Sequence, residues 1–291
     1  MKCLITGSSG FIGSHLADEL RKRGHEIFGM DVIPPKWNNI PTKIGSVTSK
    51  EDVYGAMEGM DFVFHLAGKL GTHELVDAPI EAAKINIIGT LTVLDACKNF
   101  GTKIIGISKP NCWVNTYTIT KVAAESFIEM YRREHKVKAA IVKWFNVYGA
   151  RQPLEEESGY KKLIPTAIVN ALRNTNIEIY GNGEQTMDLV HTTDTINATV
   201  AVMENWGKCE GGVFEIGVGQ EFSVNEVVNQ IIRLTDSRSK ITHIPMRKGE
   251  WENTHIKADI SNLKKMTGWE QTVSLEQGLI ETIQWYKEKY V

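Results

Sequence analysis

The sequence of 291 residues lacks the features of secreted, membrane and nucleic-acid-binding proteins. Only four cysteines are present, with no CxxC pair and no histidines at zinc-ligand spacing, so we expect neither structural disulfides nor a metal. No apolar run approaches bilayer length, and we expect no signal peptide at the N-terminus. A formal net charge of −2 argues against general affinity for nucleic acid or membrane surfaces. These absences favour a cytoplasmic protein.

Short apolar segments alternate with longer amphipathic ones through the first half of the chain. This alternation predicts βαβ units and an α/β fold with a doubly wound parallel sheet, the Rossmann arrangement. The expected strands are residues 2–6, 26–31, 62–67, 103–108 and 138–144, and the expected helices are residues 11–23, 50–57, 79–99 and 115–135.

After Gly149 the pattern changes to a polar loop over residues 150–162, followed by short helices and strands. We therefore expect two interleaved parts. Residues 1–150, with a returning segment around 187–217, should form the dinucleotide-binding domain. Residues 151–186 and 218–291 should form a smaller C-terminal substrate-binding lobe.

Gly7, Gly10 and Gly13 follow the first predicted strand and open the first predicted helix. In this context the first glycine permits a tight turn, the second lets the backbone approach a pyrophosphate, and the third allows close helix–strand packing. The positive end of the helix would then hold the anion. The segment predicts a dinucleotide site.

Asp31 ends the second predicted strand, where an acidic residue hydrogen-bonds the ribose hydroxyls of a dinucleotide. A carboxylate there repels the 2′-phosphate of NADP, and no arginine follows immediately to offset it. Lys36 lies five residues further on and could weaken the preference. We predict NAD as the cofactor.

Tyr117 and Lys121 are spaced i and i+4, so they share one face of a predicted helix. A tyrosine acts as a general base only when its pKa falls well below about 10, and a nearby ammonium favours the phenolate. The pair opens the helix after the fourth predicted strand, at the sheet edge where a nicotinamide should lie. This location favours a catalytic role for both residues.

Several motifs now occur in a recognisable order. They are the glycines of 7–13, His65-Leu66-Ala67-Gly68, the asparagine-containing segment 86–90, Tyr117 with Lys121, and the segments 144–149, 181–186 and 247–250. Together they resemble, nearly end to end, the extended short-chain dehydrogenase/reductases, in particular the NAD-dependent nucleotide-sugar epimerase/dehydratase branch.

The resemblance implies an epimerase that oxidises a nucleotide sugar transiently to a keto sugar, with Tyr117 as acid/base and Lys121 lowering its pKa. Implied NAD contacts are Gly7, Gly10, Phe11, Ile12, Gly13, Asp31, Leu66, Ala67, Gly68, Tyr117 and Lys121, and implied substrate contacts are Thr72, His73, Asn146 and Arg247. The family often dimerises through the two helices predicted at 79–99 and 115–135, so we expect a homodimer.

The loop that leads into Tyr117 departs from the family pattern because it is much shorter. Ser108 is the nearest hydroxyl and our candidate third catalytic residue, but an ungapped alignment places Lys109 at the usual Ser/Thr position. Cys112 has no partnered histidine nearby in sequence, so a nucleophilic role is not expected. Met187 replaces an arginine that commonly faces the diphosphate, and Ser46 replaces an aspartate near adenine.

Three other functions stay open. A 4,6-dehydratase typically carries an Asp-Glu pair beside the catalytic hydroxyl, which Ser108-Lys109-Pro110 lacks. A net reductase would need to exchange its cofactor in each cycle. A non-catalytic NAD-binding protein is favoured slightly by the shortened loop and opposed by the retained Tyr117 and Lys121.

Overall fold

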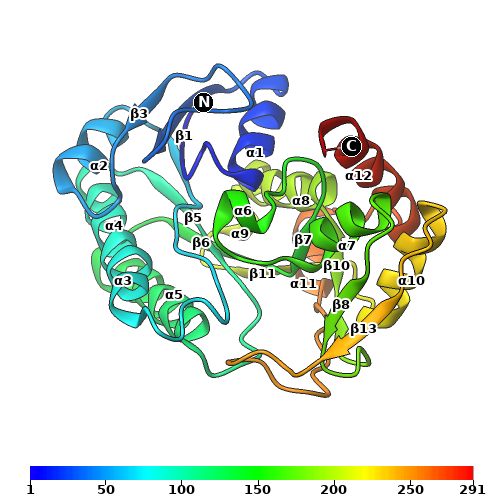
Figure 1. Cartoon of the computed structure of the whole chain (residues 1–291). Coiled ribbons are helices and arrows are strands. Elements are labelled where there is room, and N and C mark those ends of the chain that lie inside the picture. The colour runs from blue at the N-terminus through cyan, green and yellow to red at the C-terminus, as the bar shows by residue number, and fades with distance from the viewer. Residues whose placement is uncertain (291) are drawn as a thin grey trace.

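The central element of the computed structural model, which describes residues 1–290, is a seven-stranded parallel sheet with the order β11-β6-β5-β4-β1-β2-β3 (Figure 1). Its strands are β1 Lys2–Thr6, β2 Glu26–Asp31, β3 Thr42–Ile44, β4 Phe62–His65, β5 Lys103–Ser108, β6 Ala139–Trp144 and β11 Val213–Ile216. The chain order reverses between β1 and β4, and such a switch point opens a crevice at the carboxyl edge. The predicted fold class is confirmed.

Helices cover both faces of this sheet, because the buried strands are apolar on both sides. One face carries α2 Lys50–Met57, α4 Gly89–Phe100 and α5 Thr116–His135, and the other carries α1 Phe11–Lys22, α8 Thr192–Glu204, α9 Trp206–Cys209 and α11 Ser261–Thr267. Before α4, the helix α3 Pro79–Ala83 passes through a π-helical turn, η1 Lys84–Ile88. No helix within residues 1–290 is long and apolar enough to cross a membrane.

A second lobe lies to the right of the sheet in Figure 1. It contains the helices α7 Leu163–Leu172, α10 Val224–Leu234 and α12 Leu275–Tyr290, and the strand pairs β8 Ile177–Tyr180 with β13 Ile241–Ile244 and β9 Thr186–Met187 with β12 Phe222–Ser223. The parallel pair β7 Asn146–Tyr148 and β10 Leu189–His191 connects the lobes, and the short helix α6 Glu155–Ser158 lies in the predicted polar loop.

The buried cores support a division into two interleaved lobes. Side chains of α7, α10, α12 and β8 share one core, whereas those of α1, α8 and β11 share another. We propose that the predicted boundaries hold with one change. Helix α11 and Trp269 pack in the core of the sheet rather than in the second lobe, although they fall within the range 218–291.

Candidate active site

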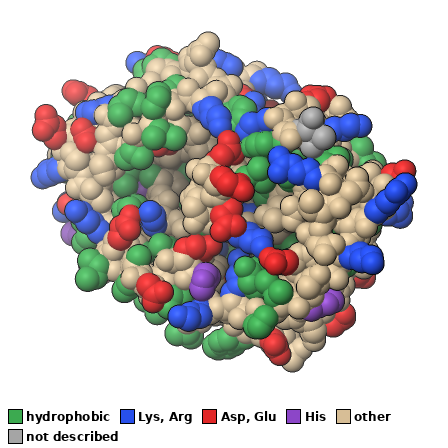
Figure 2. All heavy atoms as spheres, in the orientation of Figure 1, with side chains coloured by type: hydrophobic (Ala, Val, Ile, Leu, Met, Phe, Trp, Pro, Cys, Tyr) green, Lys and Arg blue, Asp and Glu red, His purple; other side chains and the backbone are tan. Residues whose placement is uncertain are grey.

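A cavity of about 800 Å³ separates the carboxyl edge of the sheet from the second lobe, and Figure 2 shows this face hollowed between them. Nearly all residues proposed from the sequence line it: Gly7, Gly10, Phe11, Ile12, Gly13, Asp31, Leu66, Ala67, Gly68, Thr72, Ser108, Tyr117, Lys121, Asn146 and Arg247. Segments more than two hundred residues apart therefore meet at one site.

The glycine turn has room for a dinucleotide only because its three glycines lack side chains. A Cβ on Gly13 would lie 2.1 Å from the carbonyl oxygen of Gly7, and a Cβ on Gly7 would lie 2.9 Å from the backbone nitrogen of Ala67. Gly7 also has a φ of +75°, a conformation that glycine adopts readily. The turn thus brings the N-terminus of helix α1, the positive end that would face a phosphate of NAD, against β1.

Asp31 is held at the position that a ribose contact needs. Its carboxylate accepts hydrogen bonds from the backbone amides of Ser9 (2.9 Å) and Ile33 (3.3 Å), which fix it beside the glycine turn. Lys36 pairs with Glu157 at 3.1 Å, so its ammonium is engaged there. Lys36, which could have weakened the preference for NAD, therefore has its charge neutralised by Glu157.

His65, the last residue of β4, forms hydrogen bonds to β1 and to helix α4, next to the segment 66–68 that lines the cavity. Burial lowers its pKa to about 3, so the ring is neutral near pH 7. Its Nδ1 lies 2.8 Å from Thr6 Oγ1 and its Nε2 lies 3.1 Å from Thr90 Oγ1. Because Thr90 donates its proton to the carbonyl of Asn86, it accepts from Nε2–H, and Thr6 then donates to Nδ1. Thr6 in turn accepts from Ala67 N–H at 3.2 Å.

Asn86 forms hydrogen bonds both to Lys69, which follows the segment 66–68, and to helix α5, which carries Tyr117 and Lys121. Its carbonyl oxygen accepts from Lys69 N–H at 2.7 Å, and its amide donates to Lys69 O and to Thr120 Oγ1. The residue lies in the π-helical turn η1, and such turns are frequent at functional sites. The segment from Gly68 onward is thus held against α5.

Tyr117 lies in the first turn of α5 because Asn115 caps that helix. The Asn115 side-chain oxygen accepts from Thr118 N–H at 2.9 Å, and its amide donates to Gly249 O at 2.9 Å. Trp113 Nε1 donates to Thr254 Oγ1 at 3.0 Å. The shortened loop is therefore fastened to the segment 249–254 rather than folding back on itself.

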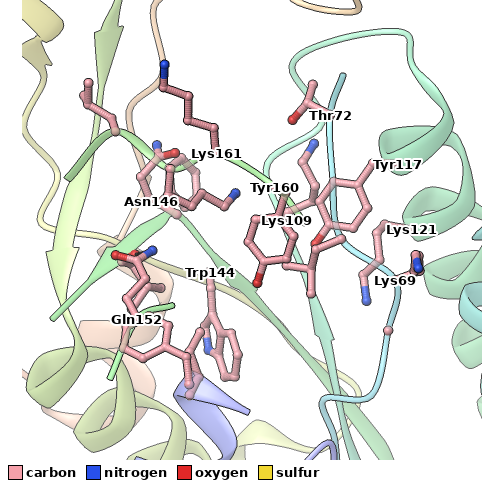
Figure 3. Close-up of a pocket in the computed structure, with 18 of the residues that line it drawn as sticks. Lys69, Thr72, Lys109, Tyr117, Lys121, Trp144, Asn146, Gln152, Tyr160 and Lys161 are labelled. Carbon is pink, nitrogen blue, oxygen red and sulfur yellow. Dashed lines mark hydrogen bonds between the residues drawn. The ribbon is translucent and has the colours of Figure 1, made fainter. Parts of the chain in front are cut away.

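Tyr117 and Lys121 both border the cavity, and Figure 3 places them on one side of it. Burial raises the pKa of Tyr117 and lowers the pKa of Lys121 to about 8. Both shifts disfavour charge, so a phenolate on Tyr117 requires additional positive charge close to its ring. Whether Tyr117 can act as a base therefore depends on which cationic side chains lie close to its ring.

The burial of Lys121 predicts a measurable effect on stability. Its folded pKa of about 8 lies below the ordinary 10.5, so the folded state binds fewer protons than the unfolded state between these pH values. Stability should therefore rise from pH 8 to pH 10.5. Replacing Lys121 by methionine should raise the free energy of unfolding by about 1–3 kcal/mol below pH 8, since each pKa unit is worth about 1.4 kcal/mol.

Urea denaturation of cofactor-free protein at several pH values measures this difference. Lys161→Met is the matched control, because Lys161 pairs with Glu178 at 3.2 Å. A Lys121→Met protein that is less stable than the wild type at pH 7 would contradict the prediction.

Ser108 does not present a free hydroxyl to the cavity. Its Oγ donates a short hydrogen bond to Glu125, whose carboxylate also pairs with Lys143 at 2.8 Å. Ser108 and Lys143 are register partners on β5 and β6, and Glu125 follows Lys121 by one turn of α5. The serine is therefore part of a partly buried polar network that joins three elements, β5, α5 and β6.

Lys109 reaches the position beside Tyr117 instead. Its Nζ donates to Thr118 Oγ1 at 2.9 Å and to Pro110 O at 2.5 Å, and it lies 5.6 Å from the centre of the Tyr117 ring. Burial lowers the pKa of Lys109. Sequence reasoning named Lys109 as the rival of Ser108, and the geometry favours Lys109 as the group that faces the reacting atoms.

A second group of cations lines the cavity around the segment 247–250, which contacts the start of α5 through Asn115. Arg247 pairs with Glu250 and lies 5.0 Å from the centre of the Tyr180 ring. Lys162 precedes α7, and its Nζ lies 5.4 Å from the centre of the Tyr160 ring. Burial and the nearby Arg247 lower the pKa of Lys162. Such a group of cations suits the phosphates of a nucleotide.

Two of these lining residues, Lys162 and Tyr160, were not predicted from the sequence. They fall in a segment that the pattern identified only as a polar loop. A local signal existed in the consecutive lysines just before the apolar residues of α7, but their approach to Arg247 depends on tertiary structure.

His73 lies outside the cavity lining, which corrects its placement from the sequence. Its neighbours turn inward: Leu75 is buried and Glu74 accepts from Lys161 N–H at 3.3 Å, so His73 is exposed on the opposite side of the loop. We therefore drop His73 as a substrate contact and retain Thr72.

The other departures from the family pattern also lie at the cavity. Met187, Ser46 and Cys112 all line it. Burial raises the pKa of Cys112, which disfavours a thiolate. Ser46 Oγ lies 2.8 Å from Thr48 Oγ1. No group of three metal-ligating side chains is found within residues 1–290.

The chain is similar to known proteins along its whole length. The model of the NAD dependent epimerase/dehydratase family matches residues 3–217. A UDP-N-acetyl-alpha-D-glucosaminuronate decarboxylase of Bacillus cytotoxicus is 34% identical over 99% of this chain and 98% of its own.

Two solved structures share the fold. UDP-glucose 4-epimerase of Thermotoga maritima with UDP-glucose superposes with a TM-score of 0.93 at 28% identity, over all of both chains. UDP-glucuronic acid 4-epimerase of Bacillus cereus, in complex with UDP-glucuronic acid and NAD, gives a TM-score of 0.91 at 25% identity, also over all of both chains.

Proposed function

The chain belongs to the NAD-dependent epimerase/dehydratase family, and we propose that it is an NAD-dependent epimerase that inverts C4 of a UDP-linked sugar. One observation carries the proposal: the Gly7–Gly13 turn, the pair Tyr117 and Lys121, and the cations around Arg247 line a single cavity. UDP and C4 are taken from the structural neighbours, which are 4-epimerases that bind UDP-sugars.

The residues of the chain divide the work of the reaction. Tyr117 removes the proton of the C4 hydroxyl and later returns a proton to the C4 oxygen. Lys109, 5.6 Å from the centre of the Tyr117 ring, and Lys121, one helical turn after Tyr117, supply the positive charge that favours its phenolate. NAD, which the Gly7–Gly13 turn and Asp31 would hold, would supply the reversible hydride acceptor for C4. Arg247 and Lys162 bind the diphosphate, so the sugar can turn over while the nucleotide stays anchored.

The carboxylates of the cavity argue against dehydration. A 4,6-dehydratase needs a carboxylate that exchanges a proton at C5. Of the four that line the cavity, Glu81, Glu178 and Glu250 are paired with cations, and Asp31 lies at the ribose end. A free base for C5 is therefore missing among the described residues. The curated decarboxylase relative makes loss of a carboxylate the second candidate for substrates that contain one.

Nuclear magnetic resonance of the reaction in D2O separates these functions. Purified protein is incubated with UDP-glucose or UDP-glucuronic acid. An epimerase yields the C4 epimer with no deuterium on the sugar carbons, because the hydride returns from the cofactor. Deuterium at C5 or C6, release of CO2, or stoichiometric NADH consumption would identify a dehydratase, a decarboxylase or a reductase. A protein that binds NAD but forms no product from either nucleotide sugar would point to a non-catalytic NAD-binding protein.

Replacement of Asp31 by alanine should reduce the difference in binding affinity between NAD and NADP. The carboxylate beside the glycine turn favours the ribose hydroxyls of NAD and repels a 2′-phosphate. We expect the wild type to bind NAD at least about tenfold more tightly than NADP, which corresponds to about 1.4 kcal/mol. Calorimetric titration of both cofactors measures the ratio. Tighter binding of NADP by the wild type would contradict the assignment.

We also propose a homodimer formed through the helices α3 to α5. Apolar side chains are exposed on this surface, including Ile80 (84%) and Ile119 (56%), and such surfaces are common at interfaces. Sedimentation at micromolar concentration measures the state. A cytoplasmic location is proposed because all four cysteines are unpaired thiols, as a reducing compartment maintains them.

A further inference from the structure

We propose that the sugar of the substrate is a uronic acid and that the Lys109 ammonium binds its C6 carboxylate. The inference deepens the proposed function, on which it rests, by naming the class of sugar. It depends on the position of Lys109, on its missing countercharge and on the roles of the other cations in the cavity.

Lys109 carries a charge without an anionic partner. Its Nζ donates to a carbonyl and a hydroxyl, Pro110 O and Thr118 Oγ1, and it forms no ion pair within residues 1–290. The nearest network carboxylate, Glu125, is already engaged by Lys143 and Ser108. An ammonium has three donors, so one remains for a ligand. A partly buried cation is costly to leave unpaired, and a bound anion offsets that cost.

The position of Lys109 selects the part of the substrate that would supply the anion. The ammonium lies 5.6 Å from the centre of the Tyr117 ring, whose hydroxyl acts at C4. In a hexose, C6 is attached to C5, the direct neighbour of C4. A carboxylate at C6 is therefore the anionic group of a nucleotide sugar that comes nearest to the reacting carbon. The diphosphate is on the opposite side, at C1.

Three of the other cations that line the cavity have carboxylate partners. Lys69, Lys161 and Arg247 pair with Glu81, Glu178 and Glu250. Lys121 belongs to the proposed catalytic pair. Lys162 forms no ion pair within residues 1–290 and interacts with both Arg247 and Lys109, and we assign it with Arg247 to the diphosphate. Lys109 is thus a cation without a carboxylate partner that lies beside the Tyr117 ring, so the charge that favours the phenolate can also bind the C6 carboxylate.

Binding to an inactive protein tests the inference without turnover. The Tyr117→Phe variant, loaded with NAD, is titrated by calorimetry with UDP, UDP-glucose and UDP-glucuronic acid. We expect UDP-glucuronic acid to bind about 10- to 100-fold more tightly than UDP-glucose, as for a hydrogen bond between charged groups. Adding Lys109→Met should remove this preference and change the affinity for UDP by less than about twofold.

Three further variants in the Tyr117→Phe background serve as controls. Lys109→Arg keeps the charge and should keep most of the preference, which excludes a purely structural effect of Lys109→Met. Thr118→Val removes the hydroxyl that positions Nζ and should reduce the preference partially. Lys162→Met should lower the binding affinity for UDP, UDP-glucose and UDP-glucuronic acid by the same factor.

The outcomes separate the inference from the proposed function. Equal affinities for UDP-glucose and UDP-glucuronic acid, or a preference that survives Lys109→Met, would overturn the uronic acid proposal while the epimerase proposal stands. If NAD binds but none of the three nucleotides does, the proposed function itself fails. The assay does not depend on whether a uronic acid is epimerised or decarboxylated, so it tests the substrate class alone.

Discussion

Replacement of Tyr117 by phenylalanine should lower kcat by about 10²–10⁴-fold, the usual contribution of a positioned acid/base, while the fold and the affinity for NAD stay nearly unchanged. The substitution deletes one oxygen and leaves the ring in place. The helix start depends on Asn115 and Thr118, and the dinucleotide turn depends on Gly7 to Gly13, so neither involves the missing hydroxyl.

The measurement has two parts. Steady-state kinetics with UDP-glucose and UDP-glucuronic acid gives kcat, and calorimetry with NAD gives the cofactor affinity. Tyr131→Phe is the matched control, because Tyr131 lies on the same helix, outside the cavity lining, and its hydroxyl donates to Asp95 at 2.7 Å. A Tyr117→Phe protein that retains most of its kcat would show that another group is the acid/base.

The sheet and its helices follow largely from local sequence. Strands β1, β2 and β5 have the predicted bounds because each is an apolar run bounded by polar or glycine residues. The two long predicted helices are also present, although the first contains the π-helical turn. That turn was not predicted from the sequence. The short edge strand β3 was also missed.

The cofactor side of the site was predicted more completely than the substrate side. Glycine spacing and an acidic residue at a strand end are local requirements of dinucleotide binding, so they can be read from one segment. The substrate side joins the segments at Thr72, Lys109, Asn146, Lys162 and Arg247, which are distant in sequence. Only the tertiary structure decides which of these side chains face the cavity and which, like His73, face outward.

Ser108 illustrates the limit of reasoning from one segment. As the last residue of β5 it ends at the carboxyl edge, where a catalytic hydroxyl belongs. Its actual partner, Glu125, is 17 residues further along the chain. The spacing of Lys121 and Glu125 on one helical face, together with Lys143 at the end of the neighbouring strand, was the available signal for this network.

Replacement of Lys109 by alanine should lower kcat by about 10²-fold, whereas Ser108→Ala should lower it by less than about tenfold. Lys109 places a positive charge next to the Tyr117 ring, where negative charge develops as the proton leaves the sugar hydroxyl. Ser108 acts at a distance through Glu125, so its loss perturbs the network without removing a charge from the reacting atoms.

Measuring kcat and KM for both variants with UDP-glucuronic acid distinguishes binding from catalysis. If Lys109 only binds the carboxylate, equally in the ground state and the transition state, its replacement by alanine raises KM and leaves kcat unchanged. If Lys109 also favours the phenolate, the alanine variant has a lower kcat at saturating substrate, and Lys109→Arg should keep part of the wild-type kcat. Circular dichroism checks that both alanine variants are folded. An active Lys109→Ala protein beside an inactive, folded Ser108→Ala protein would return the third catalytic role to Ser108, because only a hydroxyl that contacts the reacting oxygen would produce that pattern.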